Sequence, residues 1–203
     1  MNLLARNRPV LYSFEDYCAL VKEGEKGDLI EGVIYMASPD NTDANRLFTW
    51  LLGLLSFFLH IKKGGEVFGS RVAFRLDGAN GPEPDIGYVK RARLHLVKRG
   101  YVAGRPDAAM EIVSPESVDR DYIKKRRQFE KARVPEYWII DEIEKKITLL
   151  RLGKDGTYKE VLPRKGVLRS KVIKGFWLNE TWLRRKFLPD PLKTLHAILK
   201  RNW

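Results

Sequence analysis

The fold is decided by the stretch Ala108-Ala109-Met110-Glu111-Ile112-Val113. A run this short and this apolar is typical of a central strand that is buried on both faces of a sheet. Residues 119–133 follow as a predicted helix, and the run Glu136-Tyr137-Trp138-Ile139-Ile140-Asp141 then repeats the short apolar pattern. The stretch therefore predicts two central strands with a helix in the connection between them.

Segments on either side of this stretch extend the sheet and cover it. The further predicted elements are a helix over 13–21, two short strands over 28–36 around a Glu31-Gly32 turn, a long helix over 42–62, a strand over 85–89 and a hairpin over 146–162. This order predicts a mixed central β-sheet flanked by helices, in the α/β or α+β class. Residues 1–188 are expected to form one domain, and residues 189–203 a basic tail that is helical.

The composition suits a folded protein with an anionic partner. Of the 203 residues, 44% are hydrophobic, so the chain can bury a core. The net charge of +12 favours nucleic acid as the partner first, and an acidic membrane surface second. One cysteine excludes an intrachain disulfide, and a reducing cytoplasm is the compartment that we expect. The apolar run from Leu47 to Ile61 is shorter than the ~18–20 residues of a membrane span, which favours a buried helix.

Two carboxylates stand out by their position in predicted strands. Glu111 lies inside an apolar strand, where a carboxylate is costly to bury unless it is paired or holds a cation. Asp85 follows Glu83-Pro84 and opens another strand. If the two strands are neighbours, both carboxylates can converge on one hard cation, and Mg²⁺ suits such a pair. The alternatives are an ordinary strand-start residue for Asp85, and a structural ion pair with an arginine such as Arg75 for Glu111.

A lysine on the predicted helix could complete this arrangement. Asp121, Lys125 and Phe129 are spaced at i, i+4 and i+8, so they share one face of the helix. Phe129 is expected to anchor that face in the core. Lys125 could then reach back toward the carboxylates, where an ammonium can orient a water and stabilise charge on a phosphate.

Several ordered motifs resemble a known group of proteins. The matching stretches are Gly27 to Gly32, Glu83-Pro84-Asp85, Glu111 to Pro115, Arg120 to Lys125 running into Val134 to Asp141, and Lys174 to Leu178. Together they resemble the PD-(D/E)xK restriction-endonuclease-like nucleases, in the bacterial branch long catalogued as a domain of unknown function. The resemblance covers roughly residues 12 to 187, so residues 1–188 are expected to form a restriction-endonuclease-like core.

The resemblance implies a set of roles for individual residues. The metal ligands would be Asp85, Glu111 and the backbone carbonyl of Ile112, and the catalytic residues would be Asp85, Glu111 and Lys125. The lysine position of the wider superfamily is Val113 here, and Lys125 matches the helix lysine of this branch. The candidate additional site residues are Asp28, Glu31 and Asp121.

The implied activity is Mg²⁺-dependent hydrolysis of phosphodiester bonds, most simply in DNA, with Mn²⁺ as a substitute ion. A homodimer stays open, because dimers are common among nucleases that cut both strands. The alternative is a nucleic-acid-binding or regulatory module without turnover, because Ala44 or Asn45 stands where the branch usually has a histidine, and Phe129 where it has a tyrosine. No membrane partner is expected, although the basic tail keeps a membrane surface as a weaker alternative.

Two basic clusters suit contacts with phosphates. They are Lys90 to Arg99 and Lys124 to Arg127. Each can equally be a solvated face of the protein, which is the ordinary explanation for a run of charges.

Overall fold

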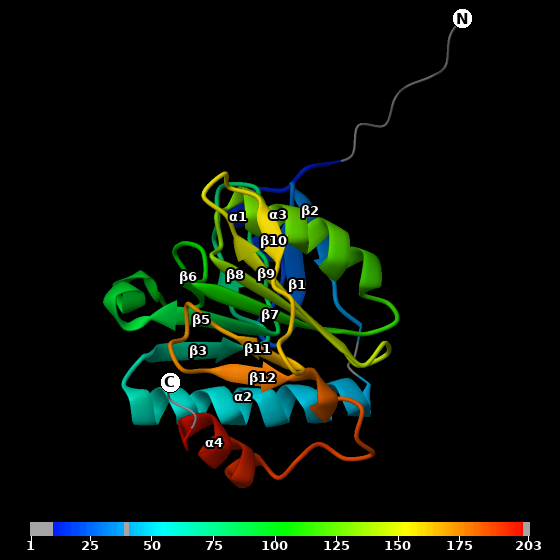
Figure 1. Ribbon diagram of the computed structural model, residues 1–203. Coiled ribbons are helices and arrows are strands. Elements are labelled where there is room, and N and C mark those ends of the chain that lie inside the picture. The colour runs from blue at the N-terminus through cyan, green and yellow to red at the C-terminus, as the bar shows by residue number, and fades with distance from the viewer. Residues whose placement is uncertain (1–9, 39–40, 201–203) are drawn as a thin grey trace, which may run out of the picture.

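The computed structural model describes residues 10–38 and 41–200 (Figure 1). Its α-helices are α1 (Phe14–Leu20), α2 (Thr42–Lys62), α3 (Arg126–Lys131) and α4 (Pro191–Lys200). Its strands are β1 (Gly27–Ile30), β2 (Val33–Met36), β3 (Gly65–Gly69), β4 (Ala73–Phe74), β5 (Ile86–Lys90), β6 (Tyr101–Val102), β7 (Ala108–Val113), β8 (Glu136–Asp141), β9 (Lys146–Leu152), β10 (Tyr158–Glu160), β11 (Val167–Arg169) and β12 (Trp177–Asn179). Three further helical segments are the 3₁₀ helices η1 (Arg91–Leu96) and η3 (Glu180–Trp182), and the π-helix η2 (Arg120–Lys125).

A six-stranded mixed sheet forms the centre of the fold, in the order β10-β9-β8-β7-β5-β3. Only the pair β7–β8 is parallel in this sheet, and the connection between these two strands runs through η2 and α3. The other neighbours in this sheet are antiparallel. Every residue of β7 and β8 is buried, which confirms the two central strands expected from the apolar runs. The predicted mixed sheet flanked by helices is confirmed.

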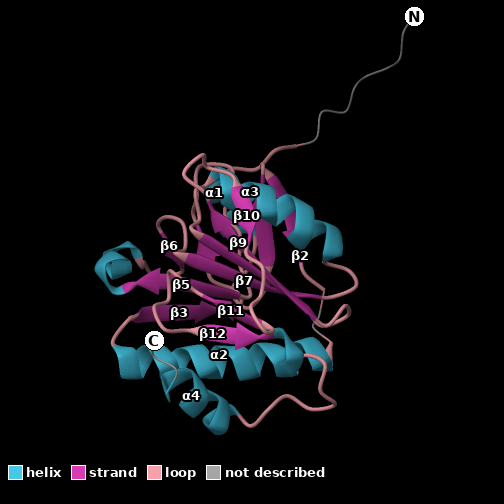
Figure 2. Ribbon diagram, in the orientation of Figure 1, coloured by secondary structure: helices cyan, strands magenta, loops and turns pink. Residues whose placement is uncertain are grey.

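The two faces of the sheet are covered by different helices. Figure 2 shows the strands between α3 on one side and α2 with α4 on the other. On the α3 side, Phe129 packs with Val113 and Tyr137, so Phe129 anchors its helix as expected. On the other side, α2 buries a row of leucines against β5, β7 and β8, and Leu195 and Ile198 of α4 join this cluster. The tail is therefore helical over Pro191–Lys200 and packs on α2, while residues 201–203 lie outside the described residues.

By length and composition alone, helix α2 could cross a membrane. Seven of its residues are nevertheless buried in the folded chain, and they belong to the main core. The helix begins after Asn41, whose side chain accepts hydrogen bonds from the backbone N–H groups of Asp43 and Ala44. This cap fixes the first turn of α2 beside the cleft described below.

The register of two strands brings the predicted acidic residues together. β5 pairs antiparallel with β7, with Ile86 opposite Met110 and Gly87 opposite Ala109. Asp85, one residue before β5, therefore lies beside Glu111. The expectation that these two strands are neighbours is confirmed.

One predicted helix differs in its geometry. The sequence predicts a regular helix over 119–133, whereas the structure has the π-helix η2 followed directly by the short α3. A π-helical turn is wider than an α-helical turn, and such turns are frequent at functional sites. Here the wide turn still places Asp121 and Lys125 on the buried side. Hydrophobic spacing carries no signal for it.

Candidate functional site

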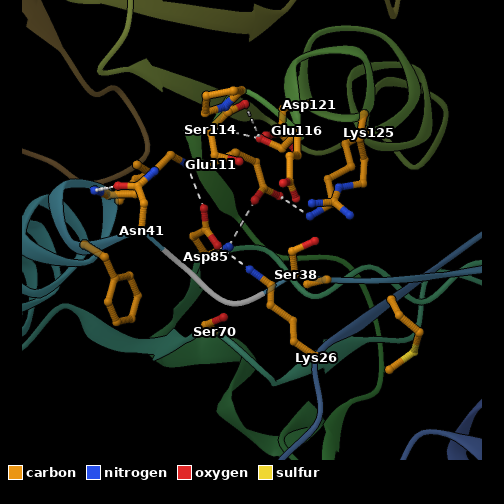
Figure 3. A pocket seen from close by; sticks show the side chains of 18 residues that line it. Lys26, Ser38, Asn41, Ser70, Asp85, Glu111, Ser114, Glu116, Asp121 and Lys125 are labelled. Atoms are coloured by element: carbon orange, nitrogen blue, oxygen red, sulfur yellow. Dashed lines mark hydrogen bonds and ion pairs between the residues drawn. The ribbon is translucent and has the colours of Figure 1, made fainter.

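Asp85 and Glu111 are fixed to each other through the backbone of β5 and β7. The backbone N–H of Asp85 donates to Glu111 Oε2 at 3.2 Å. The backbone N–H of Ile112 donates to Asp85 Oδ2 at 2.7 Å. Figure 3 shows both carboxylates in the same pocket. Each carboxylate oxygen has two lone pairs, so both side chains keep further acceptor positions beyond these backbone hydrogen bonds.

Lys125 lies between two buried carboxylates. Its side chain is 1% exposed, and its Nζ is 2.9 Å from Glu111 Oε1 and 3.0 Å from Asp28 Oδ1. It also donates to the backbone carbonyl of Glu83 at 3.4 Å. The alternative partner considered for Glu111, Arg75, instead pairs with Glu15. The structure thus brings Asp85, Glu111 and Lys125 into one cluster.

Lys26 is a further member of the cluster that the sequence did not reveal. It directly precedes β1, and its Nζ forms an ion pair with Asp85 Oδ1. Burial by itself would lower the pKa of Lys26, but the Asp85 carboxylate outweighs this effect and the pKa is raised. Lys26 is therefore a charged partner of Asp85. Only its place before Gly27 could have pointed to it, and a lone lysine there is no specific signal.

The three additional candidates are placed differently. Asp28 is fully buried, contacts Lys125, and accepts the backbone N–H of Glu83 at 2.8 Å. Asp121 is 2% exposed and lines the same pocket as Asp85 and Glu111. Glu31 is exposed at the turn between β1 and β2 and lines another cleft. The structure therefore brings Asp28 and Asp121 to the cluster, and does not bring Glu31 there.

A second layer of buried polar groups holds the loop that carries Asp85. The Tyr17 hydroxyl of α1 donates to the Glu83 carboxylate, which also accepts the backbone N–H of Gly27 at 3.1 Å. Glu83 thereby ties α1 and β1 to the Glu83-Pro84-Asp85 loop. Buried hydrogen bonds of this kind keep a site's geometry fixed.

The electrostatics push the carboxyl groups in opposite directions. Burial raises the pKa of Glu111 well above its usual range, although Lys125 opposes this shift. Burial also acts on Asp85, but Lys26 and Lys125 outweigh it and hold its pKa below the usual value. Burial raises the pKa of Asp121 to about 6. Acids with pKa values pushed apart in one cleft are characteristic of functional sites.

The cluster opens into a cleft of about 350 Å³. Asp85, Glu111, Ile112, Asp121 and Arg120 are among the residues that line it. Mg²⁺ binds through one or two carboxylates and keeps several waters, so this donor set fits a hydrated magnesium ion. Within residues 10–38 and 41–200, no group of three or more His, Cys, Asp or Glu side chains is placed to hold a metal. The two carboxylates, Asp85 and Glu111, leave positions for water around such an ion.

The start of α2 forms one wall of the cleft. Ala44 lines the cleft, whereas Asn45 is exposed. Of these two positions, Ala44 is thus the one where the resemblance leads us to expect a histidine facing the site. The methyl side chain of Ala44 supplies no ligand or proton there.

Comparisons with known proteins agree with this architecture. A crystal structure of a "putative nuclease belonging to DUF820" from Anabaena variabilis ATCC 29413 aligns with a TM-score of 0.69 and 16% identity. The alignment covers 84% of this chain and 96% of that one, and at this identity it shows the shared fold. No curated protein matches the sequence.

A family-level comparison gives the assignment. The family model Uma2, described as "Putative restriction endonuclease", matches residues 13–181, which include α1, the central sheet and the whole Asp85–Glu111–Lys125 cluster. The chain belongs to the Uma2 family.

Proposed function

We propose that this protein is a metal-dependent endonuclease that hydrolyses phosphodiester bonds, with DNA as its substrate. The observation that carries the proposal is the convergence of Asp85, Glu111 and Lys125 through direct contacts in one cleft. Membership in the Uma2 family supports the same reaction class. The net charge of +12 favours a polyanionic substrate.

Each residue of the cluster has a part in this reaction. Asp85 and Glu111 would hold a Mg²⁺ or Mn²⁺ ion, with the carbonyl of Ile112 as the proposed third protein ligand. When bound, the ion supplies polarisation of a phosphoryl oxygen and a lowered pKa for water. Lys125 orients the Glu111 carboxylate through its 2.9 Å contact. Its ammonium would also stabilise the negative charge that develops on the phosphate in the transition state. Asp121, with a pKa of about 6, is suited to accept a proton near neutral pH.

The setting of the reaction is also part of the proposal. A single cysteine, exposed on α1, suits a reducing cytoplasm. Cleavage of both strands of a duplex needs two such centres, so we propose a homodimer for double-strand cutting.

A second candidate function is nucleic-acid binding without turnover. Two observations favour it. Ala44 lines the cleft where the resemblance implies a histidine. The ammonium of Lys26 lies on Asp85 Oδ1, which is one of the oxygens that a metal would use.

A cleavage assay separates the two functions. Purified protein is incubated with supercoiled, linear and single-stranded DNA in EDTA, Mg²⁺ or Mn²⁺, beside Asp85→Asn and Glu111→Gln. Asp155→Asn is the matched control, because this carboxylate lies in the β9–β10 turn far along the chain from the cluster. We expect ion-dependent cleavage by the wild type and the control, and loss of it in the two site variants. Cleavage that persists in Asp85→Asn would contradict the proposal, and binding without cleavage in any ion would support the second candidate.

A further inference from the structure

We propose that a stripe of four cations on η2 and α3 is a track for the phosphate backbone of the bound strand. The stripe consists of Arg120, Lys124, Arg127 and Lys131. This inference rests on the proposed function, because it names the surface that would lead nucleic acid into the Asp85–Glu111 cleft.

The clefts show which of these residues lie together. Lys124, Arg127 and Lys131 line one cleft, and Arg127 and Lys131 are also i, i+4 neighbours on α3. With no more than about 1.5 Å of rise per residue, the stripe is at most about 16 Å long. Phosphates of one B-form strand follow each other at about 3.4 Å along the axis, so a stripe of this length spans about five phosphates.

The stripe is continuous with the candidate active site. Arg120 lines the cleft that holds Asp85 and Glu111. Lys124, Arg127 and Lys131 line a second cleft of about 550 Å³, whose other walls are the β1–β2 hairpin and the loop around residues 76–80. The helix thus carries cations from the cluster into the neighbouring cleft.

Two of the four cations are available for a ligand, and two already have partners. Arg120 Nε is buried and forms an ion pair with Asp28 at 3.7 Å. Arg127 and Lys131 are exposed and have no ion pair with any residue that the structure describes. Lys124 contacts Asp119 at 3.3 Å and the Tyr35 ring at 4.6 Å. A guanidinium with free N–H groups is well suited to grip a phosphate with two hydrogen bonds.

Two acids, Asp77 and Glu31, also line the second cleft and oppose phosphate binding there. The Asp77 carboxylate already accepts the backbone N–H of Ala79 at 2.8 Å and the side-chain amide of Asn80. Glu31 is exposed at the hairpin turn. The four cations of the stripe outnumber these two carboxylates, so the local balance of charge still favours an anion.

The salt dependence of binding tests the track. Affinity for fluorescent single-stranded and duplex oligonucleotides is measured in EDTA over a series of salt concentrations. The test variant is Arg127→Gln with Lys131→Gln. The control variant is Arg126→Gln with Lys154→Gln, which changes the net charge equally at exposed residues that line neither cleft. All four substitutions are at the surface, and melting curves confirm that each variant is folded.

We expect the test variant to bind more weakly, with the slope of log K against log salt smaller by about 1.4–1.8 for two lost phosphate contacts. The control is expected to keep the wild-type slope. Equal slopes for the two variants would overturn the track, because the stripe would then act only through net charge. Loss of binding to phosphatidylserine vesicles without loss of oligonucleotide binding would overturn it in favour of a lipid surface. Cleavage by the wild type in Mg²⁺ is scored separately, so a failed track and a failed nuclease are distinguished.

Discussion

Lys125→Met removes a positive charge that lies between two buried carboxylates. Lys125 is 1% exposed, and it contacts Glu111 at 2.9 Å and Asp28 at 3.0 Å. Methionine has a similar length and no charge, so packing is largely kept. The substitution removes both ion pairs of Lys125 together with its hydrogen bond to the Glu83 carbonyl.

The expected loss of stability is large. Breaking a buried ion pair by removing one partner costs about 3–5 kcal/mol. For a chain of this size, about 1 kcal/mol corresponds to about 2–4 °C, so the melting temperature should fall by about 6–20 °C. Chemical denaturation monitored by tryptophan fluorescence gives the free energy of unfolding directly. Lys124→Met is the control, because its side chain is 39% exposed and its surface pair with Asp119 is worth about 0–1 kcal/mol.

The pH dependence provides a second signature. Burial already raises the pKa of Glu111 in the wild type, and loss of Lys125 raises it further. A carboxyl group whose pKa is higher in the folded state keeps its proton there to higher pH, so it lowers stability as pH rises above its unfolded value of about 4.3. The deficit of Lys125→Met should therefore grow as the pH rises above that value. A loss of stability below about 1 kcal/mol that does not depend on pH would show that Lys125 does not form buried ion pairs, because a surface ion pair contributes at most about 1 kcal/mol.

Three other substitutions test separate parts of the account. Lys26→Met should tighten Mn²⁺ binding by about fivefold or more, because the ammonium no longer competes with the ion for Asp85 Oδ1. Calorimetry measures the affinity, and unchanged or weaker binding would show that Lys26 does not oppose the ion. A pKa of Asp121 raised to about 6 makes the folded state prefer the protonated acid, so this group should lower wild-type stability as the pH rises from about 4 to about 6. Asp121→Asn should remove this contribution, and denaturation midpoints at both pH values measure it. A pH dependence identical to that of the wild type would show that Asp121 does not titrate in this range. Tyr17→Phe should lower the free energy of unfolding by about 1–3 kcal/mol, because the buried Glu83 carboxylate loses a hydrogen-bond donor. Urea denaturation measures this change, and an unchanged free energy would mean that the Tyr17 hydroxyl does not stabilise Glu83.

Most of the sheet could be predicted from the sequence because burial on both faces leaves an apolar run with clear ends. The two runs became the central strands β7 and β8, and the placement of an acid inside the first run singled out Glu111. Asp85 could be paired with it because Asp85 directly precedes β5, the neighbour of β7. These inferences depend on local sequence and on one assumed strand pairing.

Other parts of the site depend on contacts that local sequence does not encode. Lys26 becomes a partner of Asp85 only because the Glu83 loop is tied to β1 through Gly27. Glu31 and Asp28 look equivalent in the sequence, yet the turn between β1 and β2 leaves Glu31 exposed while Asp28 is buried beside Lys125. The π-helical turn of η2 has no hydrophobic period of its own. Each of these features is set by tertiary packing.

The central claim is that Asp85 and Glu111 hold one divalent ion. Crystals grown with Mn²⁺ and measured near the manganese absorption edge test it most directly, because an anomalous peak locates the ion without assumptions about activity. We expect a peak at coordination distance from Asp85 Oδ1 and a Glu111 oxygen, with the Lys26 ammonium moved off Asp85. No peak at saturating Mn²⁺, with Lys26 still paired to Asp85 as it is here, would contradict the account.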